Sequence, residues 1–91
     1  MLKTDAEIST LIDQCRLEEA LLAIEERMAE EKESGHLFYL RGKLRLRQND
    51  WRQATGDFLM SQSLWPEGPA AEQLMMIKEI MDFFNKDMYN Q

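Results

Sequence analysis

The sequence predicts an all-α fold of about five antiparallel helices, arranged as two helical hairpins followed by one further helix. Two kinds of observation support this prediction. Apolar residues recur at helical spacing, and the most regular stripe consists of Leu17, Ala20, Leu21, Ile24 and Met28. Residues typical of helix ends separate these stripes, at Ser34-Gly35, at Asn49-Asp50 and in "WPEGP", residues 65–69.

The first hairpin is expected within residues 1–34. Thr4 and Glu7 have the spacing of a capping box, in which each side chain bonds the other residue's backbone N–H. A short helix should therefore begin here and end near Gln14. The second helix should begin at about Leu17 and continue to Ser34-Gly35, with its many glutamates on a solvated outer face.

The second hairpin contains a stretch with an ambiguous pattern. In "LRGKLRLRQNDW", residues 40–51, basic and apolar residues alternate as they do in a half-buried strand. A lone strand among helices could not satisfy its backbone hydrogen bonds, however, so we predict a helix from Leu37 to Gln48. Asp50 and Gln53 then have the spacing of a cap for a fourth helix, which carries Trp51, Ala54, Phe58 and Ser61 on one side.

The last helix is expected from about Ala70 to Phe84, with Pro69 at its first position. Its apolar arc is too wide for every member to point inward. Its methionines and phenylalanines either fill gaps in the core or mark a dimer face or docking site: Met75, Met76, Met81, Phe83 and Phe84. The tail, residues 85–91, is expected to be partly ordered.

Composition narrows the class of protein. The 91 residues suffice for one domain, and 44% hydrophobic with 31% charged residues is typical of a globular chain. No apolar run is long enough to span a membrane, and the N-terminus lacks the apolar middle of a signal peptide. A single cysteine, Cys15, excludes an internal disulfide and fits a reducing compartment. We therefore expect a cytoplasmic protein.

The net charge of −6 is unevenly distributed. Residues 1–34 hold ten acids and four bases, residues 35–66 two acids and five bases, and residues 67–91 five acids and two bases. The basic middle either complements its acidic neighbours within the fold or faces an acidic ligand. Nucleic-acid binding is not expected, because the flanks are acidic and the basic helix divides its cations between two faces.

The sequence gives no indication of an enzyme. It has no Gly-rich phosphate loop, no metal-ligand spacing and no paired carboxylates in an apolar setting, so we expect no catalytic residue, metal or cofactor. Cys15 is interpreted as a turn residue and His36, the only histidine, as a half-exposed residue at a helix start.

A shift of 34 residues superposes the two hairpins without a gap, and brings Leu17 onto Trp51, Ala20 onto Ala54 and Ile24 onto Phe58. The second unit also carries residues at characteristic places, which are Phe38, Gly42, Trp51, Ala54, Phe58 and Ser61, and it ends at Pro66. This period and these residues resemble the tetratricopeptide repeat (TPR) family. The first unit is degenerate, because Thr4 and Ile8 stand where the family has an aromatic and a small residue.

The resemblance implies an α-α superhelix in a single TPR-like domain, residues 1–91. Its parts would be a degenerate repeat (1–34), a clear repeat (35–68), a capping helix (69–84) and the tail (85–91). Arg41 and Arg45 depart from the family's leucine and tyrosine. Either their stems pack while their charged ends reach acidic neighbours, or the first helix of this repeat is rotated.

The resemblance also implies a function, that of a non-catalytic scaffold or adaptor whose first helices line a concave groove. Tyr39, Lys43 and Arg47 share one helical face at i, i+4 steps, and that face would point into the groove. The complete set of candidate partner-binding residues is His36, Tyr39, Lys43, Arg47, Ile12 and Ile77. Such a groove would suit a peptide or protein segment with acidic and apolar residues, unless it is only a solvated surface. The alternative is a homodimer formed through the last helix.

Overall fold

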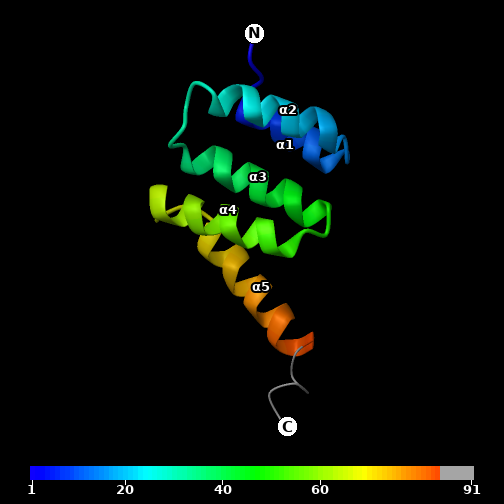
Figure 1. Cartoon of the computed structure of the whole chain (residues 1–91), viewed down its shortest axis with the longest axis vertical. Coiled ribbons are helices and arrows are strands. Elements are labelled where there is room, and N and C mark those ends of the chain that lie inside the picture. Colours follow the sequence, from blue (N-terminus) through cyan, green and yellow to red (C-terminus); the bar gives the residue numbers. More distant parts are fainter. Residues whose placement is uncertain (85–91) are drawn as a thin grey trace.

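The computed structural model describes residues 1–84, which form five α-helices. They are α1 (Asp5–Asp13), α2 (Leu17–Met28), α3 (Gly35–Arg47), α4 (Trp51–Leu64) and α5 (Ala70–Phe84). α1 and α2 overlap at one end of the long axis, α3 and α4 follow, and α5 lies at the other end (Figure 1). The molecule is elongated, with extents of 54 × 26 × 17 Å. The prediction of an all-α fold with two hairpins and a fifth helix is confirmed. The prediction for the tail, residues 85–91, lies outside the described residues.

The turns of the two hairpins have the same backbone structure, 34 residues apart. Cys15 follows α1 and Asn49 follows α3, and both have φ of 60°. The next residue's N–H donates to the carbonyl five residues earlier at 2.9 Å, Arg16 to Leu11 and Asp50 to Arg45. This is a Schellman motif, which satisfies helix-end carbonyls and turns the chain back. α2 and α4 begin directly afterwards, at Leu17 and Trp51.

Side-chain caps begin three of the helices. Thr4 and Glu7 form the expected capping box, with N···O distances of 3.0 and 3.2 Å. The Asp50 carboxylate accepts from the backbone N–H of Gln53 at 3.1 Å and thereby caps α4. Ser34 accepts from the backbone N–H of Leu37 at 3.2 Å, so that it caps α3 instead of ending α2.

The end of α2 differs from the sequence-based expectation. The helix ends at Met28, and residues 29–34 form the connection to α3. Beyond Met28 the chain reads Ala-Glu-Glu-Lys-Glu, with no large apolar residue to pack on a neighbouring helix. Because tertiary packing supplies most of the stability of a short helix, α2 ends where its packing residues end.

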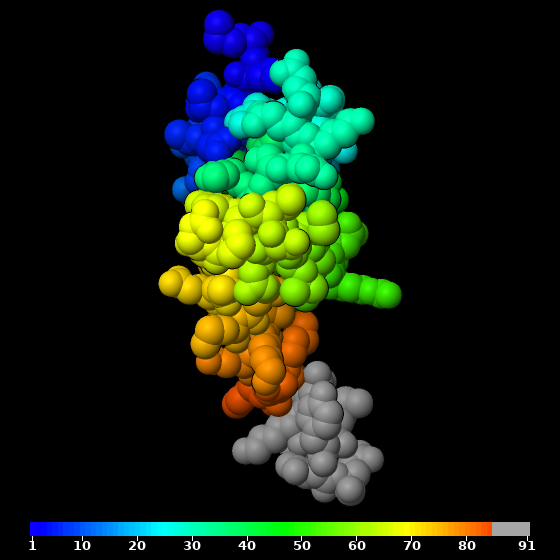
Figure 2. All heavy atoms as spheres, turned by 90° about the vertical axis from the view of Figure 1, so that its left-hand side faces the viewer, coloured from blue at the N-terminus to red at the C-terminus, as the bar shows by residue number. Residues whose placement is uncertain are grey.

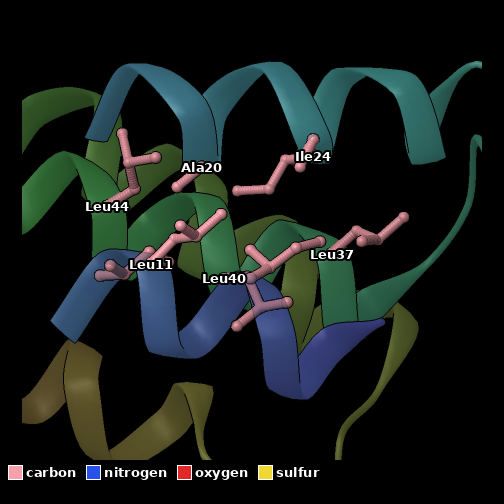
Figure 3. Packing of buried hydrophobic residues seen from close by; sticks show 9 residues of the cluster. Leu11, Ala20, Ile24, Leu37, Leu40 and Leu44 are labelled. Atoms are coloured by element: carbon pink, nitrogen blue, oxygen red, sulfur yellow. The ribbon is translucent and has the colours of Figure 1, made fainter. Parts of the chain in front are cut away.

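The buried residues form two clusters. The first lies among α1, α2 and α3, where side chains from all three helices meet (Figure 3). It consists of Ile8, Leu11, Ile12, Ala20, Ala23, Ile24, Leu37, Leu40 and Leu44. The second lies between α4 and α5, where Ala54, Phe58, Ala70 and Ile77 are buried. Side chains of Tyr39 and Leu46 pack against this second cluster from α3, the helix that also contributes to the first cluster.

The contact between α3 and α4 is close because Gly42 faces Phe58. A Cβ atom at Gly42 would lie 2.7–2.9 Å from three ring atoms of Phe58, which is nearer than packed carbon atoms come. The fully buried hydroxyl of Ser61 donates to the Gly35 carbonyl at 2.7 Å. The contact of Gly42 on α3 with Phe58 on α4 therefore sets the separation of these two helices.

An ion pair also joins α3 to α4. The Arg41 guanidinium donates to both carboxylate oxygens of Asp57, with N···O distances of 3.0 and 2.9 Å. Asp57 is buried on the face of α4 that packs on α3. Of the two alternatives for Arg41, the structure has the first, in which the charged end reaches an acidic neighbour. The Arg45 guanidinium bonds Gln48 at 3.3 Å.

α5 is packed on one side for only part of its length. Ala70 and Ile77 are buried against α4, and Leu74 packs beside them. The C-terminal part of the helix extends beyond the other four helices along the long axis (Figures 1 and 2). No helix within residues 1–84 combines the length and apolar character needed to cross a membrane.

Candidate functional site

The exposed face of α3 brings together two of the predicted partner-binding residues, Tyr39 and Lys43. Both are half-buried, and the Lys43 ammonium lies 5.8 Å from the centroid of the Tyr39 ring. The Tyr39 ring packs at an angle against Phe58, with centroids 5.7 Å apart. This packing fixes the aromatic ring, while the cation beside it remains accessible, a combination that suits an apolar segment carrying acidic groups.

Arg47 lies one turn further along the same face, but its guanidinium is directed to the α1–α2 turn. Its Nη1 donates to the Cys15 sulfur at 3.4 Å, and its Nη2 lies 3.8 Å from an Asp13 oxygen. The Arg47 side chain is 46% exposed, so these contacts contribute little to stability and can exchange with water. The three residues of the predicted row therefore do not act as one surface. Tyr39, with Lys43 beside it, packs against α4, whereas Arg47 contacts the α1–α2 turn.

His36 begins the same row but contacts the α4–α5 junction. Its ring stacks on Trp65 with centroids 3.7 Å apart and an interplanar angle of 19°. Gly68 packs against the six-membered part of the same indole, where a Cβ atom would overlap it. His36 and Gly68 thereby hold Trp65, which connects the end of α4 to α5. The sequence analysis did not anticipate this role, although Trp65 next to the Pro66–Pro69 break offered a signal.

Two of the predicted groove residues, Ile12 and Ile77, were placed wrongly on the surface. Ile12 is 1% exposed and belongs to the core among α1, α2 and α3. Ile77 is 5% exposed and packs toward α4, because α5 turns the face bearing Ala70, Leu74 and Ile77 to that helix. Neither side chain can contact a partner without unfolding of its core.

α5 carries the exposed phenylalanines of the described residues and three exposed methionines. Large apolar side chains are also exposed outside α5, at Met1, Leu22, Leu59, Met60 and Leu64. Met75, Phe83 and Phe84 are 63%, 74% and 75% exposed, and Met76 and Met81 are each 37% exposed. The Phe83 and Phe84 rings meet edge to face, with centroids 5.7 Å apart. All five methionines and phenylalanines that the sequence analysis singled out are thus exposed. Gap filling in the core therefore does not explain Met75, Phe83 and Phe84.

The charged groups with displaced pKa values lie away from both surfaces. Hydrogen bonds from the Thr4 backbone and hydroxyl lower the pKa of Glu7. Burial alone would lower the pKa of Arg27, but hydrogen bonds to Asp5 and Glu31 raise it above its usual value. These groups belong to a helix cap and to an ion-pair cluster that joins α1 to α2. Within residues 1–84 no three His, Cys, Asp or Glu side chains are grouped so that they could hold a metal ion.

A solved structure resembles this chain over nearly its whole length. It is the solution NMR structure of Bacteroides fragilis protein BF1650, which shares 34% sequence identity with a TM-score of 0.83. The match covers 99% of this chain and 92% of that one. No family model matches the sequence, and the search among curated proteins gives no match. Similarity of this extent in both sequence and structure shows that the chain belongs to the same family as Bacteroides fragilis protein BF1650.

Proposed function

We propose that the protein is a non-catalytic protein–protein interaction module of TPR type, a scaffold or adaptor that works in the cytoplasm. The TPR assignment is supported by the two Schellman turns 34 residues apart and by the close contact of Gly42 with Phe58. The single cysteine, which is free and exposed, supports the assignment to a reducing compartment.

One observation carries the proposed function: the C-terminal part of α5 projects from the body and exposes large apolar side chains. A folded chain gains stability by burying such groups, so their exposure on a projecting helix favours a partner that covers them. α5 is also the only described helix that lacks a hairpin partner within residues 1–84.

The face of α3 is the second part of the proposal. Without Ile12 and Ile77, the proposed binding groove is reduced to Tyr39 and Lys43, with His36 and Arg47 at its two ends. Its partner would be a peptide or protein segment with acidic and apolar residues. Self-association through α5 is the alternative function, and the same exposed phenylalanines favour it.

Photo-crosslinking from defined positions tests the proposal. Benzoylphenylalanine would replace Phe83 or Tyr39 in the native host, with Glu26 on the exposed side of α2 as the matched control position. We expect discrete protein adducts from position 83, position 39 or both, and none from position 26. Adducts at control level from both positions would contradict an interaction function at these surfaces.

A further inference from the structure

The projecting end of α5 has a definite chemical character, apolar with acidic groups. Met76, Ile80 and Phe83 follow one another at i, i+4 and i+7, so they form a stripe along one side of the helix. Glu79 lies directly beside this stripe, and Glu72, seven residues earlier in the first turn of α5, lies on the same side of the helix. A surface that covers this end should therefore be apolar and carry a cation at its margin.

The acidic groups of α5 are not neutralised equally. Asp82 forms an ion pair with Lys78 at 3.1 Å. Neither Glu72 nor Glu79 takes part in an ion pair within the described residues 1–84. Two free carboxylates next to an apolar stripe attract a basic surface and oppose an acidic one.

The chain itself provides a surface of the complementary kind, on α3. Tyr39 presents a half-exposed aromatic ring with the Lys43 ammonium 5.8 Å from its centroid. Lys43, like Glu79, has no ion-pair partner within the part of the chain that the structure describes. This surface lies in the basic segment, residues 35–66, whereas both flanking segments are acidic.

The end of α5 cannot cover this surface in its own molecule. α5 runs away from α3 along the long axis, and its last turns lie at the far end of the described chain (Figure 1). Contact between the two surfaces therefore requires a second copy of the protein. Under two-fold symmetry the same contact would form twice, and the buried area would double.

We propose that the protein forms a reciprocal homodimer in which the C-terminal end of α5 packs on the Tyr39–Lys43 face of α3 in the other copy. This inference rests on the proposed interaction function and names its partner. Phe83 would contact the Tyr39 ring, and Glu79 would pair with Lys43. The two candidate surfaces are then the two halves of one interface.

Sedimentation equilibrium of the purified full-length protein tests the dimer. We expect a concentration-dependent dimer that weakens with added salt, because the pairing of Glu79 and Lys43 is screened. Replacing both phenylalanines (Phe83→Ser with Phe84→Ser) should give a monomer with unchanged helical circular dichroism, since both side chains are exposed. A wild-type protein that remains monomeric up to millimolar concentration would overturn the proposal.

Charge exchange tests the docking position. Lys43→Glu and Glu79→Lys should each raise the dimer dissociation constant about tenfold, because each places like charges together twice per dimer. The double variant, which exchanges the charges, should restore most of the affinity. Lys32→Glu, on the α2–α3 connection, makes the same charge change away from both surfaces and should have no effect. A dimer indifferent to Lys43→Glu would show that α5 docks elsewhere and would refute the proposed interface.

The crosslinking experiment separates this inference from the function on which it rests. If the purified protein is monomeric but position 83 captures a different protein in the native host, the dimer is refuted and the interaction function stands. If the protein is monomeric and no adduct forms, both are refuted. Crosslinks between position 83 of one copy and α3 of another, located by mass spectrometry, would support the dimer directly.

Discussion

Cys15 and Asn49 occupy equivalent places in the two hairpin turns, yet they differ in how well they tolerate the required backbone. Both have φ of 60°, in the left-handed region where a Cβ atom crowds the following carbonyl. Asparagine adopts this conformation more readily than cysteine, because its side chain can bond to the local backbone. The α1–α2 turn is therefore the more strained of the two.

Replacing Cys15 with asparagine should stabilise the protein by about 0.5–1 kcal/mol, because the strain is relieved while the turn is kept. The weak contact of Arg47 with the sulfur, at 3.4 Å, is the only described side-chain hydrogen bond that would be lost. Urea unfolding followed by circular dichroism measures the change. The reverse substitution, Asn49→Cys, should destabilise by a similar amount, and equal stability of all three proteins would contradict the argument.

The lowered pKa of Glu7 predicts a pH-dependent contribution to stability. Hydrogen bonds from Thr4 favour the carboxylate in the folded state, so its pKa lies below the ordinary value of 4.5. Such a group binds fewer protons folded than unfolded near this pH. Its contribution is complete above pH 4.5 and is lost as the pH falls through the lowered pKa.

The titration of Glu7 can be followed by carbon-detected NMR, and its midpoint should lie below 4.5. Thr4→Ala removes the hydroxyl and should raise the midpoint toward that value, with fraying of the first turn of α1. A midpoint unchanged by Thr4→Ala would mean that the hydroxyl has no part in lowering the pKa.

At the scale of the element, different kinds of contact hold the helix pairs together. α1 and α2 are joined by apolar packing and by the Arg27–Asp5 ion pair. α3 and α4 pack closely at Gly42, which faces the Phe58 ring, and they share the Arg41–Asp57 ion pair. α4 and α5 depend on a smaller cluster of buried residues, so this contact is the easiest to weaken.

Two glycine-to-alanine substitutions in neighbouring helices should have opposite effects. Gly42→Ala should cost about 1–3 kcal/mol, because the new methyl group overlaps the Phe58 ring and the helices must separate. Gly56→Ala on α4 should gain about 0.5–1 kcal/mol, because no atom lies within 4 Å of the added Cβ and alanine favours the helix. Thermal unfolding of the two variants should shift in opposite directions. A stabilising Gly42→Ala would show that α3 and α4 are not held at this separation.

At the scale of the whole molecule, the helices follow one another along the long axis, and each packs on helices one or two places away in the chain. The two ends of the array therefore differ from its middle. Both faces of the α3–α4 hairpin are covered, one by α1 and α2 and the other by α5. α5 has one covered face and one free face. The last helix of the array therefore keeps an uncovered face with exposed apolar side chains.

Removing α5 should expose the cluster around Phe58 and Trp51. A fragment of residues 1–69 should lose cooperative unfolding or aggregate, as judged by size-exclusion chromatography and circular dichroism. A shorter deletion, ending the chain after residue 80, keeps Leu74 and Ile77 in place and serves as the control. It should remain folded, with the helicity of its remaining residues. A well-folded 1–69 fragment would show that α5 is not needed to complete the core.

Local sequence signals determined the number and type of the elements. The capping box at Thr4, the cap at Asp50 and the apolar stripe from Leu17 to Met28 act within one or two helical turns, so they need no tertiary information. The 34-residue spacing of the hairpins was likewise visible in the sequence. The abundance of methionine and phenylalanine on the last helix was also visible in the sequence, and all five of these side chains are exposed.

Only the tertiary structure decided which faces and charges remain free. Ile12 and Ile77 lie on helix faces whose direction depends on how one helix rotates against the next, and no local pattern fixes that rotation. Arg41 forms an ion pair with Asp57, sixteen positions away, and Arg47 contacts Cys15 in the α1–α2 turn. Both contacts exist only because folding brings distant segments together. Of the predicted site residues, Tyr39 and Lys43 lie together on α3, whereas Ile12 and Ile77 are buried. The direction of α5 is set by packing of Ala70, Leu74 and Ile77 on α4, and this direction leaves its C-terminal end free.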